Sequence, residues 1–310
     1  DMKARTNGEI YIGVVGPVRT GKSTFIKRFM NLMVLPNIED ENDRNRANDE
    51  LPQSSSGKTI MTTEPKFVPN EAVSIKTEEG IELNVRLIDC VGYMVEGATG
   101  HMEGEEERLV KTPWFDYEIP FTKAAAIGTK KVITEHSTIG VVVTCDGSFG
   151  EIAAKQYEPA EEETIKQLKA LKKPFVVLLN TIHPYSESTK QLAAEKEEKY
   201  QTKVLPMNLE QMKKEDIYEI IKSVLMEFPI SSIGFYVPRW TEMLKKDHPL
   251  KMELLQMARD VITEKTTMRD IYEEQEKEYE YITGQKLESV AMDSGEAVSY
   301  THLTLPTTSR

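Results

Sequence analysis

The stretch Gly16-Pro-Val-Arg-Thr-Gly-Lys-Ser23 decides the fold of this 310-residue chain, because its spacing, G-x-x-x-x-G-K-S, is that of a phosphate-binding loop. Residues 9–15 lie directly before it; they are apolar and rich in β-branched side chains, which predicts a buried strand. Residues 22–33 follow it with apolar side chains at helical spacing. A strand, a glycine loop and a helix in this order predict a P-loop nucleoside triphosphatase.

The residue types of this loop suit triphosphate chemistry. Backbone N–H groups can wrap the β-phosphate closely only where glycine leaves room, and the helix N-terminus adds about +0.5 charge. Lys22 is predicted to neutralise the β and γ oxygens, and the Ser23 hydroxyl to coordinate magnesium. Arg19 either adds charge at the phosphates or faces solvent or the acidic loop that follows. The loop residues expected to bind nucleotide are Gly16, Arg19, Thr20, Gly21, Lys22, Ser23 and Thr24.

A second motif, D-x-x-G, runs from Asp89 to Gly92 and follows the apolar residues Leu87 and Ile88. An aspartate that ends a strand opposite a P-loop holds the magnesium ion, often through water. We predict Asp89 as a catalytic and metal-binding residue and Gly92 as a nucleotide contact; an ordinary aspartate at a strand end is the alternative. Tyr93 occupies the next position, where many small GTPases carry a water-orienting glutamine, so we expect slow hydrolysis unless another group completes the site.

Two adjacent threonines, Thr62 and Thr63, are candidates for a nucleotide sensor. They follow residues 37–56, which are rich in Asp, Glu, Asn and Arg and predict a mobile surface loop. A threonine here can bind magnesium through its hydroxyl and the γ-phosphate through its amide, so that the loop orders only around a triphosphate. The sequence does not choose between the two, although Thr62 is taken as the metal ligand, and solvated loop threonines are the alternative.

The base-binding motif of guanine-specific relatives is incomplete. Those proteins place N-K-x-D after a strand, and its aspartate accepts hydrogen bonds from guanine. The corresponding residues here are Asn180-Thr181-Ile182-His183. Asn180 stays a predicted nucleotide contact, but His183 replaces the carboxylate, and polar readout of this kind is worth about 10⁴-fold in discrimination. The sequence therefore predicts ATP with Mg²⁺ rather than GTP.

The rest of the chain predicts an α/β fold. A hairpin is expected over 72–77 and 82–89, and further strands over 139–144, 175–179 and 204–206, with a helix over 161–171. Strands that alternate with helices predict a three-layer sandwich around a mainly parallel sheet.

Three regions are expected along the chain. Helical patterns follow the last strand at 209–226, 238–245 and 249–281, and they place the end of the ATPase domain, residues 1–247, near Asp247. Residues 248–298 are predicted as the helical start of a second domain. Residues 299–310 lack a helical period and resemble translated sequencing-adapter read-through; a natural polar tail is the alternative.

Composition narrows the function classes. A formal net charge of −12 argues against a nucleic-acid partner and against direct adsorption to anionic lipid. Apolar runs fall short of the roughly 18 residues that span a bilayer, so a cytosolic protein is expected. Cys90 and Cys145 lie in apolar runs and are predicted as buried thiols. The chain starts with Asp1 rather than Met and is expected to be a fragment.

Longer strings resemble the stage IV sporulation protein A family, the spore-coat morphogenetic ATPases of endospore-forming bacteria, over residues 8 to about 290. The resemblance rests on Ile10-Tyr-Ile-Gly-Val-Val-Gly-Pro-Val-Arg-Thr-Gly-Lys-Ser-Thr-Phe-Ile26, Leu35-Pro-Asn-Ile38, Asp49-Glu-Leu-Pro-Gln-Ser54, Met61-Thr-Thr-Glu-Pro-Lys-Phe67, Leu87-Ile-Asp-Cys-Val-Gly-Tyr93 and Thr134-Glu-His-Ser-Thr-Ile-Gly140.

This resemblance implies a member of the translation-factor-related GTPase class that has turned to ATP, with Lys22 as phosphate-binding lysine, Asp89 as magnesium-site aspartate, and Thr62 and Thr63 as sensors. It implies that ATP hydrolysis drives self-assembly into a polymer, the basement layer of the spore coat. The polymer would lie on the mother-cell side of the outer forespore membrane, held by a small amphipathic membrane-anchoring peptide and joined by other coat morphogenetic proteins. A regulatory GTPase-like switch and a structural coat scaffold with a vestigial nucleotide site are the alternatives.

Overall fold

The computed structural model describes residues 9–52, 64–76, 82–103, 106–150, 152–230, 232–272, 279–291 and 296–303. The chain forms two compact units that divide between Val224 and Leu225, ahead of the boundary expected near Asp247. In the described ranges, no helix combines the length and apolar character needed to cross a membrane.

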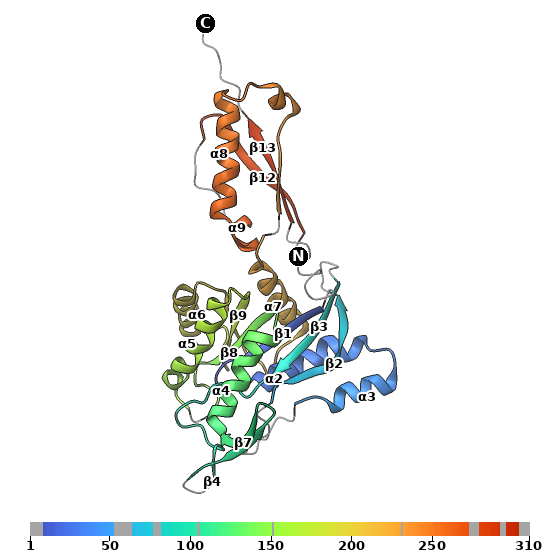
Figure 1. The fold of residues 1–310 in the computed structure, drawn as a ribbon, viewed down its shortest axis with the longest axis vertical. Helices are drawn as coiled ribbons and strands as arrows, with labels where there is room; N and C mark the ends of the chain where they lie inside the picture. The colour runs from blue at the N-terminus through green and yellow to red at the C-terminus, as the bar shows by residue number, and fades with distance from the viewer. Residues whose placement is uncertain are drawn as a thin grey trace. The chain divides into compact units, whose positions relative to one another are not determined.

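The first unit is built on a six-stranded sheet with the order β10-β9-β8-β1-β3-β2 (Figure 1). All neighbouring strands run parallel except β2 and β3, which form an antiparallel pair at one edge. The mainly parallel α/β sheet expected from the sequence is thus confirmed, as is the predicted hairpin. The strands are β1 (Glu9–Val15), β2 (Lys66–Lys76), β3 (Glu82–Asp89), β8 (Ile139–Cys145), β9 (Phe175–Asn180) and β10 (Val204–Met207).

Helices cover both faces of this sheet, which is why every residue of β8 and β9 is buried and why both strands read as continuous apolar runs. On one face, strand residues such as Val15 and Val142 pack with Ile165 and Ala193 from helices α5 and α6. Helix α2 packs against β1 and β3, and Figure 1 shows it behind the sheet with α4 in front. These helices are α2 (Lys22–Phe29), α4 (Phe121–Lys131), α5 (Ala154–Ala170), α6 (Glu187–Tyr200) and α7 (Lys214–Met226).

One prediction in this unit is wrong. Within the expected mobile loop 37–56, Glu41–Asp49 form helix α3. Asp40 caps this helix, since its carboxylate accepts hydrogen bonds from the N–H groups of Asn42 and Asp43. The sequence pattern missed α3 because Ala47 is its only buried residue, which leaves no apolar stripe to recognise.

Two short hairpins stand between β3 and α4, where no element is expected from the sequence. They consist of β4 (Met102–Glu103) with β5 (Glu106–Glu107), and β6 (Leu109–Thr112) with β7 (Phe115–Pro120). Glu107 caps the start of α4, because its carboxylate accepts hydrogen bonds from the N–H of Thr122, at 2.8 Å, and from the Thr122 hydroxyl. Strands of two to six residues are too short to show a period in the sequence.

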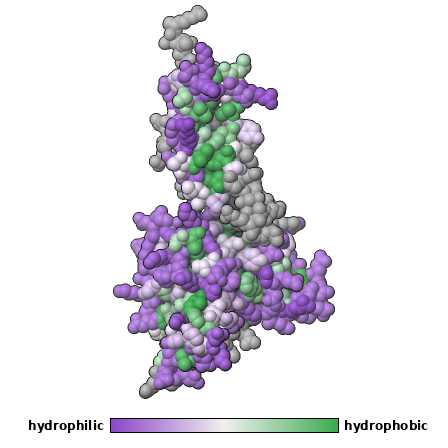
Figure 2. Space-filling model, viewed as in Figure 1, coloured by the Kyte–Doolittle hydropathy of each residue, from purple (hydrophilic) through white to green (hydrophobic). Residues whose placement is uncertain are grey.

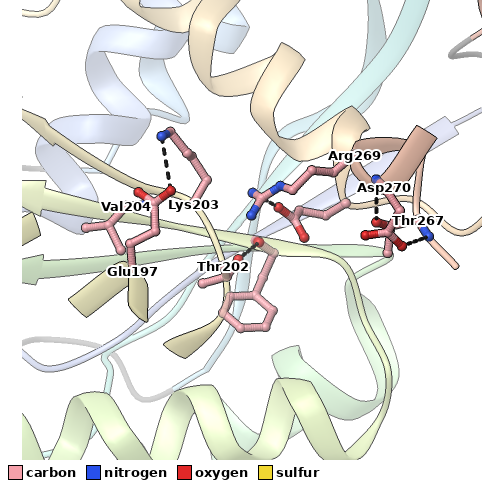
Figure 3. Close-up of polar contacts among 9 residues, drawn as sticks. Glu197, Thr202, Lys203, Val204, Thr267, Arg269 and Asp270 are labelled. Atoms are coloured by element: carbon pink, nitrogen blue, oxygen red, sulfur yellow. Dashed lines mark hydrogen bonds and ion pairs between the residues drawn. The ribbon is translucent and has the colours of Figure 1, made fainter. Parts of the chain in front are cut away.

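The edge strand β10 is fixed at its start by polar contacts (Figure 3). Glu197 of α6 accepts hydrogen bonds from Lys203 Nζ at 3.1 Å and from the Val204 N–H at 3.3 Å. The Thr202 hydroxyl donates to the carbonyl oxygen of Phe175 at 2.8 Å. These bonds hold the residues at and just ahead of the start of β10, where its backbone pairing with β9 begins.

The second unit is not the purely helical start expected from the sequence. It contains a three-stranded sheet of order β11-β13-β12, in which β13 runs parallel to β11 and antiparallel to β12. Strand β13 includes residues 299–303 of the tail that the sequence pattern set apart. The strands are β11 (Ser232–Tyr236), β12 (Ile282–Ala291) and β13 (Glu296–Leu303).

The single long helix expected over 249–281 is also wrong. Helix α8 (Pro249–Glu264) ends before residues 265–267, and α9 (Met268–Tyr272) starts after them. Asp270 stabilises this break, because its carboxylate accepts hydrogen bonds from the N–H of Thr266 at 2.8 Å and from the N–H of Thr267 at 2.7 Å. Figure 3 shows the contact between Asp270 and Thr267. The helix expected over 238–245 is a 3₁₀ segment, Arg239–Met243.

Helix α8 of the second unit carries apolar side chains on two sides. Figure 2 shows hydrophobic residues gathered on α8 among hydrophilic ones. The buried side of α8, formed by Leu250, Leu254 and Met257, packs with Ile282 of β12. The other side exposes Met252, Leu255 and Ile262.

Candidate nucleotide-binding site

The phosphate-binding loop follows β1 and leads into α2, and its backbone requires glycine at two positions. Gly16 has φ +126° and Gly21 has φ +101°, both in the region that favours glycine. A Cβ atom on Gly16 would overlap the carbonyl oxygen of Val143 in β8, and one on Gly21 would lie 2.7 Å from Asn180 Nδ2. Strands β8 and β9 therefore leave no room for a side chain at Gly16 or Gly21. This restriction holds whether or not phosphate is bound.

Lys22, the first residue of α2, points back into this loop. Its side chain is only 5% exposed, and its amine donates hydrogen bonds to the carbonyl oxygens of Gly16, at 3.4 Å, and Pro17. Burial lowers the pKa of the amine, although Asp89 acts in the opposite direction. The structure thus places this amine against two loop carbonyl oxygens at the N-terminus of α2. A helix N-terminus with a cation beside it is favourable for phosphate.

Asp89 ends β3 beside the loop, as the parallel pairing of Val14 with Asp89 requires. The Ser23 hydroxyl donates to Asp89 Oδ2 at 3.4 Å. Burial raises the pKa of Asp89 to about 6, an effect that Lys22 and Ser23 partly offset. Asp89 Oδ1 is buried and accepts no hydrogen bond from any residue that the structure describes.

The donor set at this point fits a magnesium ion. A hydroxyl and a carboxylate with an unsatisfied oxygen are hard ligands of the kind that Mg²⁺ takes from a protein, while phosphate and water supply the rest. Ser23 and Asp89 are adjacent, as the sequence predicted. Thr62 and Thr63, the other predicted ligand and sensor, lie outside the described residues.

Gly92 lies next to the lysine. It has φ +96°, and a Cβ atom on it would overlap the carbonyl oxygen of Gly16 and lie 2.5 Å from Lys22 Nζ. Its N–H donates a hydrogen bond to the Thr129 hydroxyl of α4 at 3.1 Å. The D-x-x-G motif therefore places both of its defining residues against the P-loop lysine and serine.

Tyr93 contacts the phosphate loop through its backbone, while its side chain contacts α5. Its carbonyl accepts a hydrogen bond from Val18 N–H at 2.9 Å, and its N–H donates to Gly16 at 3.3 Å. The phenol donates to Gln167 Oε1 in α5 at 2.8 Å. Burial raises the pKa of Tyr93 to about 12, so the phenol stays protonated near neutral pH. This position therefore supplies no general base.

The side chain of Asn180 is hydrogen-bonded within the protein, and one of its partners is the phosphate loop. Its side-chain amide donates to the carbonyl oxygen of Thr20 at 3.0 Å, and its side-chain oxygen accepts from Leu209 N–H at 3.2 Å. Asn180 thus ties β9 to the phosphate loop and to the segment after β10. His183 is exposed, and its backbone N–H donates to the Thr181 hydroxyl at 3.1 Å.

The remaining predicted loop residues have different positions. Arg19 is exposed, has φ +60°, and donates to Thr99 through its guanidinium, at 2.8 Å to the hydroxyl and 3.2 Å to the carbonyl. Thr20 is buried, and its hydroxyl donates to Pro17 at 3.0 Å. Thr24 is half-buried in the first turn of α2.

Sequence reasoning missed three residues that the fold brings to this site: Thr99, Thr129 and Gln167. Each lies outside the two motifs and reaches the site from a segment after Asp89. Hydroxyl and amide side chains in such segments carry no local pattern, so only the packing of α4, α5 and the segment after β3 reveals them.

Known proteins resemble this chain over nearly its whole length. Residues 1–229 match the model of the family described as stage IV sporulation protein A, ATPase domain, and residues 230–304 match the middle domain of the same family. The chain is 48% identical over 299 residues to stage IV sporulation protein A of Bacillus anthracis, and 46% identical over 299 residues to that of Bacillus subtilis. Each alignment covers 96% of this chain and 61% of the relative. A relative from Clostridioides difficile is 54% identical over 271 residues, which cover 87% of this chain and 55% of that protein.

Proposed function

Because this chain belongs to the stage IV sporulation protein A family, we propose that it is a slow, magnesium-dependent ATPase whose hydrolysis drives assembly of the spore-coat basement layer. The chain carries the ATPase and middle domains of that family and spans about 61% of the length of two curated relatives. The observation that carries the proposal is the meeting of Lys22, Ser23 and Asp89 at the carboxyl ends of β1 and β3.

Each of these residues has a part in phosphoryl transfer. The Lys22 amine donates to the carbonyl oxygens of Gly16 and Pro17 in the structure. When nucleotide binds, the amine would donate to phosphate oxygens instead. Ser23 and Asp89 would hold Mg²⁺, with Thr62 as the expected third residue, and the ion would neutralise charge on the β and γ oxygens. Gly16 and Gly21 keep side chains away from the phosphates.

Slow turnover follows from the surroundings of Tyr93. Its phenol is protonated near neutral pH and its proton is donated to Gln167, so it offers no general base to an attacking water. The backbone of Tyr93 also holds the segment after Asp89 against the loop. A group from a second copy, brought in by assembly, would complete such a site and link hydrolysis to polymer formation.

The fold and its setting complete the proposal. The antiparallel edge strand β2 in an otherwise parallel sheet supports assignment to the translation-factor-related class of P-loop proteins, with helix layers on both faces. By family, the polymer would lie on the mother-cell side of the outer forespore membrane, with a small amphipathic anchoring peptide and other coat proteins as partners. Nothing in this setting requires nucleic acid.

The direct test is phosphate release by the purified chain with ATP or GTP, with magnesium or with excess chelator. We expect release from ATP with magnesium only, accompanied by nucleotide-dependent sedimentation of the chain. Lys22→Ala serves as the inactive reference. A preference for GTP would make the protein a GTPase-like switch, and assembly without phosphate release would make it a scaffold with a vestigial site.

Specificity gives a prediction of its own. His183→Asp is expected to raise the ratio of GTP to ATP affinity by at least about tenfold, because it restores a carboxylate where guanine donates two hydrogen bonds. Competition against a fluorescent ATP analogue measures this ratio. Ser188→Asp adds the same charge at an exposed position of α6 and should leave the ratio unchanged. An equal response of the two variants would contradict base readout at this position.

A further inference from the structure

The N–H of Gly92 is bound to a residue that neither motif contains. Thr129 accepts this hydrogen bond at 3.1 Å, and its own hydroxyl proton goes to the carbonyl oxygen of Ala125 at 2.8 Å. A hydroxyl has one proton and two lone pairs, so these two bonds are compatible and their directions are determined. Thr129 is fully buried, which excludes water as a ready substitute.

Gly92, whose N–H makes this bond, lies beside the P-loop lysine. Gly92 is so close to the P-loop lysine that a Cβ atom on it would lie 2.5 Å from Lys22 Nζ. Its positive φ lets the preceding peptide turn toward either side at low cost, since glycine tolerates such conformations. Backbone N–H groups of this kind are good donors to phosphate oxygens.

We propose that Thr129 sets how strongly the site prefers ATP over ADP. In the absence of a γ-phosphate, the Thr129 hydroxyl holds the Gly92 N–H; when ATP binds, a γ-phosphate oxygen takes this N–H and the bond to Thr129 breaks. Thr129 is thus a positioning residue that acts through Gly92, and the inference rests on the proposed function, in which Gly92 contacts the nucleotide. Breaking the bond to Thr129 costs free energy when ATP binds, whereas ADP, which has no γ-phosphate, leaves the bond intact.

The exchange has a defined route into the rest of the unit. Thr129 lies in the last turns of α4, and α4 begins at a cap supplied by Glu107 of the hairpin β4–β5. Release of Gly92 removes one of the bonds between α4 and the site, while the cap holds the other end of the helix to the hairpin. The nucleotide state would therefore reach α4 directly through Thr129.

Thr129→Val tests this proposal, because valine keeps the shape of threonine and removes the acceptor. In the nucleotide-free and ADP-bound states the Gly92 N–H then lacks its hydroxyl acceptor and keeps only the weak thiol acceptor of Cys90, whereas a γ-phosphate oxygen satisfies it, so the ratio of ATP to ADP affinity should rise about tenfold. The dissociation constants of ADP and of a non-hydrolysable ATP analogue, measured by calorimetry with saturating magnesium, give the ratio. Thr129→Ser retains the hydroxyl and should keep the ratio of the unsubstituted chain.

The matched control is Thr164→Val. Thr164 is also fully buried in a helix, and its hydroxyl donates to the carbonyl oxygen four residues earlier, Ala160, at 2.7 Å. This variant loses the same hydroxyl within a helix but leaves Gly92 untouched, so the ratio should not move. An unchanged or lowered ratio in Thr129→Val, with binding intact, would overturn this inference alone.

A second measurement does not depend on the stability of any variant. The ¹H–¹⁵N resonance of Gly92 in the unsubstituted chain should shift with the ATP analogue and keep its nucleotide-free position with ADP. An equal shift with both nucleotides would overturn the inference. Failure of the unsubstituted chain to bind either nucleotide would overturn the proposed function, and this inference with it.

Discussion

Lys22→Ala is expected to lower ATP hydrolysis by about 10³-fold, the upper range for loss of one preorganised donor to transition-state charge. The amine is buried at the N-terminus of α2 and already lies among the backbone groups of the loop. Its removal leaves the phosphates without their nearest cation, and no other lysine is buried in the parts of the chain that the structure describes.

Lys27→Ala is the control for this change, because Lys27 lies on the same helix with an exposed side chain. Phosphate release and nucleotide affinity should be those of the unsubstituted chain. Circular dichroism and thermal unfolding establish that both variants fold. Hydrolysis by Lys22→Ala within tenfold of the unsubstituted rate would contradict the assignment of the loop as the catalytic site.

Asp89→Asn is expected to abolish magnesium-dependent hydrolysis and, at the same time, to stabilise the nucleotide-free protein near neutral pH. Burial raises the pKa of this carboxyl from 3.8 to about 6, which means that the folded chain binds its proton more tightly than the unfolded chain. Stability from this group is therefore fully present at low pH and is lost as pH rises from about 4 to about 6. Asparagine remains neutral and avoids that loss, worth about 1–3 kcal/mol in the free energy of unfolding.

Urea unfolding without nucleotide, at about pH 4 and about pH 8, measures this effect. The two proteins should have equal stability at the lower pH, and the variant should be more stable at the higher pH. Asp116→Asn, at an exposed position of β7, should match the unsubstituted chain in stability and in hydrolysis. A loss of stability in Asp89→Asn at the higher pH would show that the buried carboxylate is favourable to the fold.

This pair of outcomes explains why Asp89 is held in an unfavourable setting. A buried carboxylate with a free oxygen weakens the empty protein, but it is ready for a cation without loss of an existing hydrogen bond. Both expected effects come from the same carboxylate. Such opposition between stability and function is typical of active sites.

The sequence predicted the nucleotide unit well because its signals are local. The loop Gly16–Ser23 needs glycine at two positions and a lysine before a helix, and β8 and β9 are continuous apolar runs. The pairing of Asp89 with Ser23 followed from a general rule, since the carboxyl ends of adjacent parallel strands meet at one edge. The loop, the two apolar strands and the D-x-x-G motif are each complete within about ten residues of sequence.

Elements whose stability comes from distant contacts were missed or misassigned. Helix α3 has a single buried residue, and the hairpins β4–β5 and β6–β7 are too short for a period. In the second unit, β12 and β13 exist through pairing with each other and with β11, which lies far away in the sequence. Helical patterns in the intervening residues gave no sign of that sheet.

The amino-acid sequence alone predicted the chemistry of this protein from a phosphate loop, an aspartate at a strand end and a histidine in place of the guanine-reading carboxylate, because each depends on residue types at fixed spacing. Only the tertiary structure decided how that chemistry is held and controlled. It joined Thr129 to Gly92, Gln167 to Tyr93, and Asn180 to Thr20. These bonds link segments far apart in the chain, and a hydrogen bond of this kind depends on where packing brings two groups, which no local pattern encodes.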